Sequence, residues 1–232
     1  AQAGPWARGA GNVFISVTSS AEETLGDIGE ALTYGTVEID PERTTSVYAE
    51  IGIAPHLTGA IDLQFGEVSQ MSVVLLRYTF TRPDSRWQFA LDAGAGNRSV
   101  DDSERGMLAR VGASVGWGFG PWSRPLGDET MGHEGGWIAL DAHALVETGS
   151  TDGDGADPIL QGELTFGLNM TDRLAGILAV KAEDWPDAEP VVSLRPSIVF
   201  ALTGQTSIQA GAHAAVEGSD AVGLSLSIWQ EF

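Results

Sequence analysis

The sequence contains no cysteine and only one lysine, Lys181. Without cysteine the chain can form neither a disulfide framework nor a thiolate metal site. Long apolar runs are also missing: stretches such as 73–76 and 175–180 fall far short of the roughly 20 residues that a membrane-spanning helix needs. Acidic residues outnumber basic ones by 32 to 12, and a formal charge of −20 argues against nucleic-acid binding, which requires a basic surface.

What the sequence does contain is apolar residues alternating with small or polar ones. In 221–232 the apolar residues occupy the even positions from Val222 to Ile228 and again Phe232. This period of two predicts a strand with an apolar face and a polar face. Ser225, Ser227 and Trp229 should then point away from the apolar side. Similar segments recur along all 232 residues with no linker between them, which predicts a single all-β domain. Twelve strands are predicted, at 11–19, 44–54, 57–66, 70–80, 86–97, 107–118, 136–147, 158–168, 173–183, 190–201, 206–217 and 221–232.

The connections between these strands are of two kinds. Tight turns are predicted at 54–56, 81–85, 169–172 and 203–205. The longer, acidic connections are 20–43, 97–106, 148–157, 183–190 and the short 217–220. Short turns at one end and longer polar loops at the other are typical of an antiparallel up-and-down transmembrane β-barrel with periplasmic turns and extracellular loops. The segment 119–135 is an exception, because it is a long connection at the periplasmic end.

The same periodicity would suit a soluble secreted β-sandwich that binds carbohydrate, with its apolar face inward. Two features favour the barrel. The apolar face is nearly pure on almost every strand and carries few of the lysine or proline residues that protect an open sheet edge, Pro196 being the exception. Aromatic residues, among them Trp87 and Trp117, also gather near the predicted turns, as a membrane-interface girdle requires. We therefore predict that the last strand closes the barrel by pairing with 11–19.

The chain resembles Gram-negative outer-membrane β-barrel proteins over its whole length. The resemblance is carried by the final strand, where Leu224, Leu226, Ile228 and the terminal Phe232 match the signal that the barrel assembly machinery recognises. Gln230 departs from that pattern, since the position is usually apolar or aromatic. The resemblance implies export with removal of a signal peptide, residence in the outer membrane and contact with lipopolysaccharide. The resemblance leaves open whether the chain forms a homo-oligomer or binds another membrane protein.

Within this arrangement, residues 1–10 are expected to form a periplasmic N-terminal segment, and 20–43 the first and longest extracellular loop. Ala1-Gln2-Ala3 has the small-x-small pattern found at signal-peptide cleavage sites. In 20–32, Ser20 and Glu23 resemble a capping box, which predicts a short helix in the first loop; the alternative is that the strand continues here, with polar turns. If the helix forms, this segment is a candidate for narrowing a channel.

If the apolar faces contact lipid, the opposite faces line a lumen rich in ionisable groups. The predicted pore-lining residues are Glu50, Asp62, Arg77, Asp92, Arg110, Asp141, His143, Glu163, Lys181, Arg195 and His213. Acids and bases largely alternate from strand to strand, and neighbouring strands are about 4.8 Å apart, so these charges should form pairs. The leading hypothesis is a narrow porin-like channel for ions or small polar solutes. The alternative is a structural or interaction barrel whose salt bridges fill the lumen.

Other chemistry has weaker support. Asp152, Asp154 and Asp157 bring carboxylates and glycines together as calcium sites do, but without the distal bidentate Glu of an EF-hand loop. They are therefore weak candidates for a surface metal site. For catalysis, the luminal Asp141 and His143 have no serine positioned beside them by the sequence pattern. No catalytic residues and no cofactor are predicted.

Overall fold

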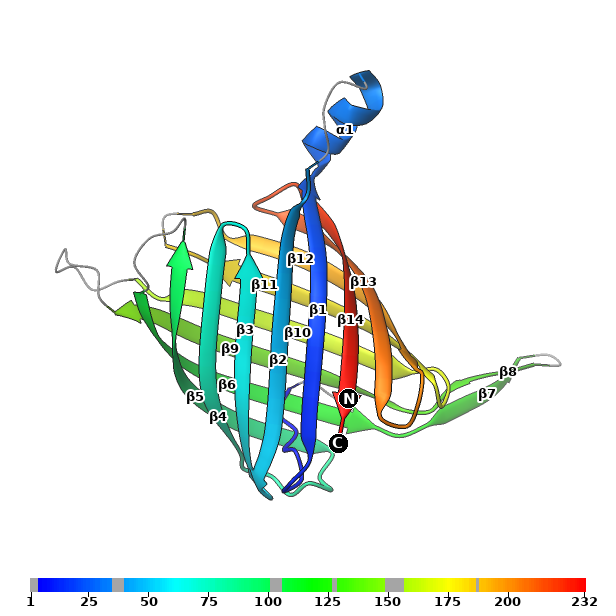
Figure 1. The fold of residues 1–232 in the computed structure, drawn as a ribbon. Helices are drawn as coiled ribbons and strands as arrows, with labels where there is room; N and C mark the ends of the chain where they lie inside the picture. Colours follow the sequence, from blue (N-terminus) through cyan, green and yellow to red (C-terminus); the bar gives the residue numbers. More distant parts are fainter. Residues whose placement is uncertain (1–3, 35–39, 101–105, 127–128, 149–156, 187) are drawn as a thin grey trace.

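Twelve antiparallel strands close into one barrel in the computed structural model, which describes residues 4–34, 40–100, 106–126, 129–148, 157–186 and 188–232 (Figure 1). Every barrel strand pairs with its neighbours along the chain, except that β6 pairs directly with β9. The barrel strands are β1 (Val13–Thr24), β2 (Glu42–Ala54), β3 (Leu57–Gly66), β4 (Ser69–Thr79), β5 (Trp87–Val100), β6 (Gly106–Phe119), β9 (Gly136–Thr148), β10 (Ile159–Asn169), β11 (Leu174–Asp184), β12 (Val191–Ala201), β13 (Thr206–Glu217) and β14 (Ala221–Glu231).

The barrel closes where the sequence predicts. β14 pairs with β1 in a register that runs from Phe14 opposite Glu231 to Thr24 opposite Ala221. Closure satisfies both edges of the barrel sheet at once, because every one of its twelve strands has a partner on each side. A β-sandwich has two sheets with free edges, so the sandwich alternative is wrong.

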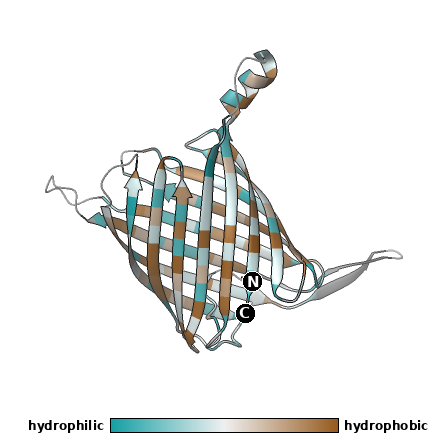
Figure 2. Ribbon diagram, in the orientation of Figure 1, coloured by the Kyte–Doolittle hydropathy of each residue, from teal (hydrophilic) through white to brown (hydrophobic). Residues whose placement is uncertain are grey.

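The outer face of the barrel is apolar. On β14 the side chains of Leu224, Leu226 and Ile228 are more than half exposed, whereas that of Ser227 is 3% exposed. The same alternation on the other strands leaves their larger apolar side chains exposed, and Figure 2 shows it as alternating hydrophobic and hydrophilic bands along the strands. Since a water-soluble protein buries its larger apolar face, this inverted pattern is that of a barrel whose solvent on the outside is lipid.

An aromatic belt surrounds part of one end of the barrel. Trp87 and Trp117 are Cα partners on β5 and β6, with ring centroids 6.3 Å apart, and Phe119 and Phe166 continue the belt toward β10. This end also has the short connections 54–57, 79–87, 169–174 and 201–206, and we call it the turn end; the opposite end is the loop end. Aromatic side chains at this level fit the interface between lipid tails and water.

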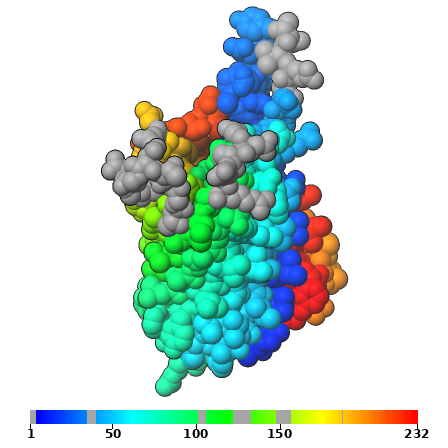
Figure 3. Space-filling view, turned by 60° about the vertical axis from the view of Figure 1, so that its left-hand side comes forward, coloured from blue at the N-terminus to red at the C-terminus, as the bar shows by residue number. Residues whose placement is uncertain are grey.

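A short helix, α1 (Leu25–Tyr34), stands above the barrel at the loop end (Figures 1 and 3). The predicted helix start at Ser20 and Glu23 is wrong, because Ser20 is part of β1 and pairs with both neighbouring strands. Thr24 caps the helix instead: its hydroxyl accepts a hydrogen bond from the Asp27 backbone N–H at 3.1 Å. None of its residues is buried, so α1 does not narrow the lumen. In the part of the chain that the structure describes, no helix has the length and apolarity to cross a membrane.

The predicted long connection at 119–135 instead contains a hairpin that lies outside the barrel sheet. β7 (Trp122–Leu126) and β8 (Glu129–His133) pair with each other in a two-stranded sheet. They extend β6 and β9 past the turn end of the barrel (Figure 1).

Candidate functional site

An open cavity of about 410 Å³ occupies one side of the lumen. Its wall carries hydroxyl groups from β1, β2 and β14, such as those of Thr18, Ser46 and Ser227. Charged side chains from the opposite strands complete it, with Glu163 on β10, Lys181 on β11 and Arg195 on β12. Two tryptophans, Trp137 and Trp229, also line the cavity. These groups give the cavity wall both hydrogen-bond donors and acceptors.

The other side of the lumen is filled by side chains. Near the loop end, Val73, Leu108, Leu145 and Ile159 form a buried apolar cluster on the inner faces of β4, β6, β9 and β10, with Met71 and Trp185 packed against it. An eight-stranded barrel is filled by its own side chains, whereas sixteen strands leave an aqueous channel. This twelve-stranded barrel combines a packed side with an open side.

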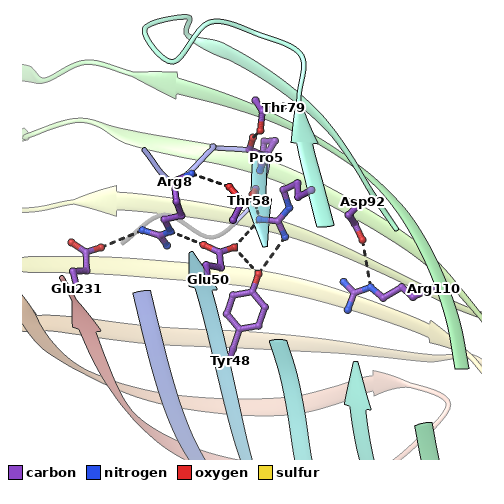
Figure 4. Close-up of polar contacts among 11 residues, drawn as sticks. Pro5, Arg8, Tyr48, Glu50, Thr58, Thr79, Asp92, Arg110 and Glu231 are labelled. Atoms are coloured by element: carbon purple, nitrogen blue, oxygen red, sulfur yellow. Dashed lines mark hydrogen bonds and ion pairs between the residues drawn. The ribbon is translucent and has the colours of Figure 1, made fainter. Parts of the chain in front are cut away.

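A buried polar network at the turn end is centred on Glu50 (Figure 4). Its Oε1 atom lies 2.8 Å from Arg77 Nη1 and accepts a hydrogen bond from the Tyr48 hydroxyl at 2.6 Å. Its Oε2 atom lies 2.6 Å from Nε of Arg8, a residue that precedes the first strand. Glu50 and Arg77 are 3% and 5% exposed, and several partners compensate the cost of burying these charges.

Arg110 holds a second group of charges. Its guanidinium lies 3.6 Å from Asp92 on the neighbouring β5 and 3.6 Å from Asp62 on β3. The contact with Asp62 spans the two strands between β6 and β3, which are β5 and β4. On β5 it passes Gly94, the Cα partner of Arg110. A Cβ at Gly94 would lie only 2.8 Å from the Cβ of Leu75 on β4, so this position of β5 has no room for a side chain.

All eleven predicted pore-lining residues lie on strand faces opposite the exposed apolar side chains. Glu163, Lys181, Arg195 and His213 line the open cavity. Glu50, Arg77, Asp92 and Arg110 belong to the buried networks described above. Asp141 is the Cα partner of Ser114 on β6 and of Glu163 on β10. His143 is opposite Gly112, where an added Cβ would be 2.7 Å from both His143 Nδ1 and Asp92 Oδ2.

The predicted pairing of opposite charges occurs, although often not between adjacent strands. Arg77 of β4 reaches Glu50 of β2, and Arg195 of β12 lies 3.8 Å from Glu163 of β10. Lys181 pairs at 3.0 Å with Glu183 of its own strand. At the loop end His213 Nε2 lies 2.5 Å from Glu22 Oε2. On the concave inner face of a curved sheet, side chains from strands that are not adjacent can meet. The alternation of acids and bases between neighbouring strands does not predict such contacts.

Sequence reasoning missed the contribution of residues 4–12. Pro5 is fully buried, and the Gly4 and Pro5 carbonyls accept hydrogen bonds from Arg77 Nη1 and Thr79 Oγ1, each at 2.9 Å. This segment therefore lies inside the turn end of the barrel. No periodicity marks it, since it is short and irregular; Pro5 and Trp6 in a segment otherwise rich in Gly and Ala are the only local signal.

Metal and catalytic chemistry find little support. Of the candidate metal ligands, Asp152 and Asp154 lie outside the described residues and Asp157 is exposed. Among the residues that the structure describes, no group of three or more His, Asp or Glu side chains is placed to hold a metal ion.

One Gly-x-Ser-x-Gly match exists at Gly112–Gly116, but Ser114 lies within β6 and not on a strand-to-helix turn. In the described structure no hydrogen bond joins Ser114 Oγ to His143 Nδ1, so these two side chains do not form a nucleophile–base pair.

Comparison with known proteins shows which solved structures share this fold. No protein-family model matches the chain, and no curated protein matches it significantly. Among solved structures, the KdgM porin superimposes with a TM-score of 0.57 at 8% identity, covering 94% of this chain and 99% of that one. The COG4313 outer membrane channel from Pseudomonas putida F1 gives 0.58 at 12% identity, covering 100% and 99%.

A third similar structure is an enzyme, the outer membrane phospholipase A from Escherichia coli, with a TM-score of 0.50 at 8% identity and coverage of 94% and 89%. At these identities the likeness shows the fold and nothing about chemistry. The chain has the closed antiparallel barrel fold of outer-membrane proteins.

Proposed function

We propose that this chain is an outer-membrane channel for passive diffusion of ions and small polar solutes. The observation that carries the proposal is the cavity of about 410 Å³ in the lumen, walled by hydroxyl, amide and charged groups. A barrel with a purely structural role has no need of such a cavity, because its interior packs best when filled. The KdgM porin and the COG4313 channel, which share the fold, are named as a porin and a channel.

Charge at the loop end supports a preference for cations. The five loop ranges 20–43, 97–106, 148–157, 183–190 and 217–220 together hold nineteen acidic residues and three arginines. A mouth with this net charge of −16 raises the local concentration of cations and lowers that of anions. We infer that the channel favours cations, and that the loop end faces the cell exterior.

Orientation and assembly follow from the same proposal. The exposed apolar residues Leu224, Leu226 and Ile228 of β14, and Phe232 directly after it, contact lipid and bind the barrel assembly machinery during insertion. Acidic loops at the outer surface suit contact with lipopolysaccharide through bridging divalent cations. These partners are part of the proposal and rest on the resemblance of the final strand.

The direct test replaces a charge in the open cavity. Arg195 lines the cavity and its side chain is 44% exposed, so Arg195→Glu is expected to fold. In planar bilayers we expect this variant to pass more cations per anion than the unsubstituted protein, because the wall gains two negative charges relative to the original. Arg173→Glu, at an exposed turn outside the cavity, is the matched control and should leave selectivity nearly unchanged. Folded protein that carries no current would favour the filled structural barrel instead.

A further inference from the structure

Residues 4–12 cross the turn end of the lumen and are held there by the barrel wall. Besides the contacts of Gly4 and Pro5, the Arg8 backbone N–H donates to Thr58 Oγ1 at 3.1 Å, and Gly11 N–H donates to the Gly52 carbonyl at 2.8 Å. Two wall glycines make room for the segment. A Cβ at Gly52 would collide with the Gly9 carbonyl, and one at Gly116 would lie 2.5 Å from the Trp6 ring.

The side chain of Arg8 occupies a site built from three neighbouring strands. Phe14 of β1 is the Cα partner of both Glu50 on β2 and Glu231 on β14, so the three residues form a row across the wall. The Arg8 guanidinium carbon lies 4.5 Å above the centre of the Phe14 ring. Its Nε is 2.6 Å from Glu50 and its Nη1 is 3.4 Å from Glu231 (Figure 4). An aromatic face between two carboxylates is suited to a planar cation.

Two of the three residues of this row have partners besides Arg8. Arg77 and the Tyr48 hydroxyl hold Glu50 through its other oxygen, and the Phe14 ring packs edge-on against Trp229 with centroids 5.9 Å apart. Because Glu50 and Phe14 are held in this way, they lose little entropy when the row binds a ligand.

The row also lies next to two hollows of the barrel. Trp229 borders the open luminal cavity, and two residues further along β14 Glu231 borders a hollow of about 390 Å³ at the turn end. Arg8 lines that hollow together with Gly204 and Gln205. The contacts of Arg8 therefore stand between the two spaces.

We propose that Glu50, Phe14 and Glu231 form a binding site for a guanidinium group, that Arg8 is its internal occupant, and that a solute bearing a guanidinium group displaces Arg8 and loosens residues 4–12. The binding site stands on the contacts alone. Only its consequence for flow through the barrel rests on the proposed channel function.

Chemical rescue tests the site without any current. In Arg8→Ala, refolded in detergent, Arg77 still pairs with Glu50, so the barrel is expected to form with a Tm lowered by roughly 2–8 °C. Methylguanidinium at millimolar concentration should restore part of this loss, whereas the same concentration of tetramethylammonium should not. Arg82→Ala, at an exposed arginine of the same end, should show neither loss nor rescue. Adding Glu231→Gln to Arg8→Ala should weaken the rescue, because one carboxylate of the row is gone.

Bilayer recording tests the consequence. Arg8→Ala should conduct more than the unsubstituted protein, and methylguanidinium should reduce the current of the variant by refilling the site. If methylguanidinium protects Arg8→Ala no better than tetramethylammonium, the binding site is overturned, whatever the currents show. If rescue succeeds but neither protein conducts, the site stands and the channel function fails.

Discussion

Arg77 shows how a single side chain joins the wall to the segment inside it. It is 5% exposed, pairs with Glu50, and donates to the Gly4 carbonyl. Arg77→Gln leaves Glu50 with Arg8 as its remaining cation and breaks the anchor of the N-terminal segment. We expect it to lower the free energy of unfolding by about 3–5 kcal/mol, the usual cost of breaking a buried ion pair.

Urea titration followed by tryptophan fluorescence, in a detergent that permits refolding, measures this loss. Arg173→Gln provides the comparison, because that arginine is exposed in a turn. It should change the free energy of unfolding by no more than about 0.5 kcal/mol. Equal effects from the two substitutions would contradict a buried network around Glu50.

Glycine has a specific role at Gly112. A Cβ there would lie 2.7 Å from both Asp92 Oδ2 and His143 Nδ1, which fill the space above it. Gly112→Ala should therefore destabilise the barrel by about 1–3 kcal/mol, as overpacking does. Gly118 lies on the same strand with nothing within 4 Å of an added Cβ, so Gly118→Ala should be nearly neutral in the same urea titration. The prediction fails if both alanines are tolerated equally.

At the scale of one element, β14 has one face for lipid and one for the lumen. Leu226 is 56% exposed on the outer face, whereas its neighbour Ser225 lines the open cavity. In lipid vesicles Leu226→Arg should lower the free energy of unfolding by about 2–4 kcal/mol, because the charge must enter the hydrocarbon layer. Ser225→Arg places the same charge among polar groups and should cost less than about 1 kcal/mol. The reverse order would mean that the faces are assigned the wrong way round.

The strands were largely predictable because each depends on local alternation. The alternation of Leu224, Leu226 and Ile228 shows that they share one face of the strand, whichever strands lie beside it. A sheet with an apolar outer face and polar inner positions has to close into a barrel to pair the backbone groups of its two edge strands. The start of α1 was not predictable, because Ser20 and Thr24 are both acceptable caps and only pairing with β2 and β14 assigns Ser20 to a strand.

The luminal site was predictable in composition but not in arrangement. Alternation placed Glu50, Arg77 and Arg110 inside the barrel. Which of them meet depends on the curvature of the wall, because Arg110 of β6 reaches Asp62 of β3 past the two strands between them. The partnership of Arg8 with Glu231 joins residues 223 positions apart, and no local pattern contains it.

At the scale of the whole molecule, charge is unevenly distributed along the barrel. If the acidic loop end sets the cation preference, that preference should weaken with salt, because the Debye length falls from about 10 Å at 0.1 M to about 3 Å at 1 M. The ratio of potassium to chloride permeability should therefore decrease over this range of potassium chloride concentration. A ratio that stays constant would place selectivity in the narrow lumen, where Glu163, Lys181 and Arg195 are screened less.

The central claim is that the barrel is a channel with a cation-favouring mouth, and a planar bilayer under a potassium chloride gradient tests it most directly. Protein that is shown to be folded, by a change of gel mobility on heating, is inserted and the reversal potential of single openings is measured. The account predicts small, discrete openings with a reversal potential on the cation side of zero. Folded protein that gives no openings, or openings selective for chloride, would contradict it.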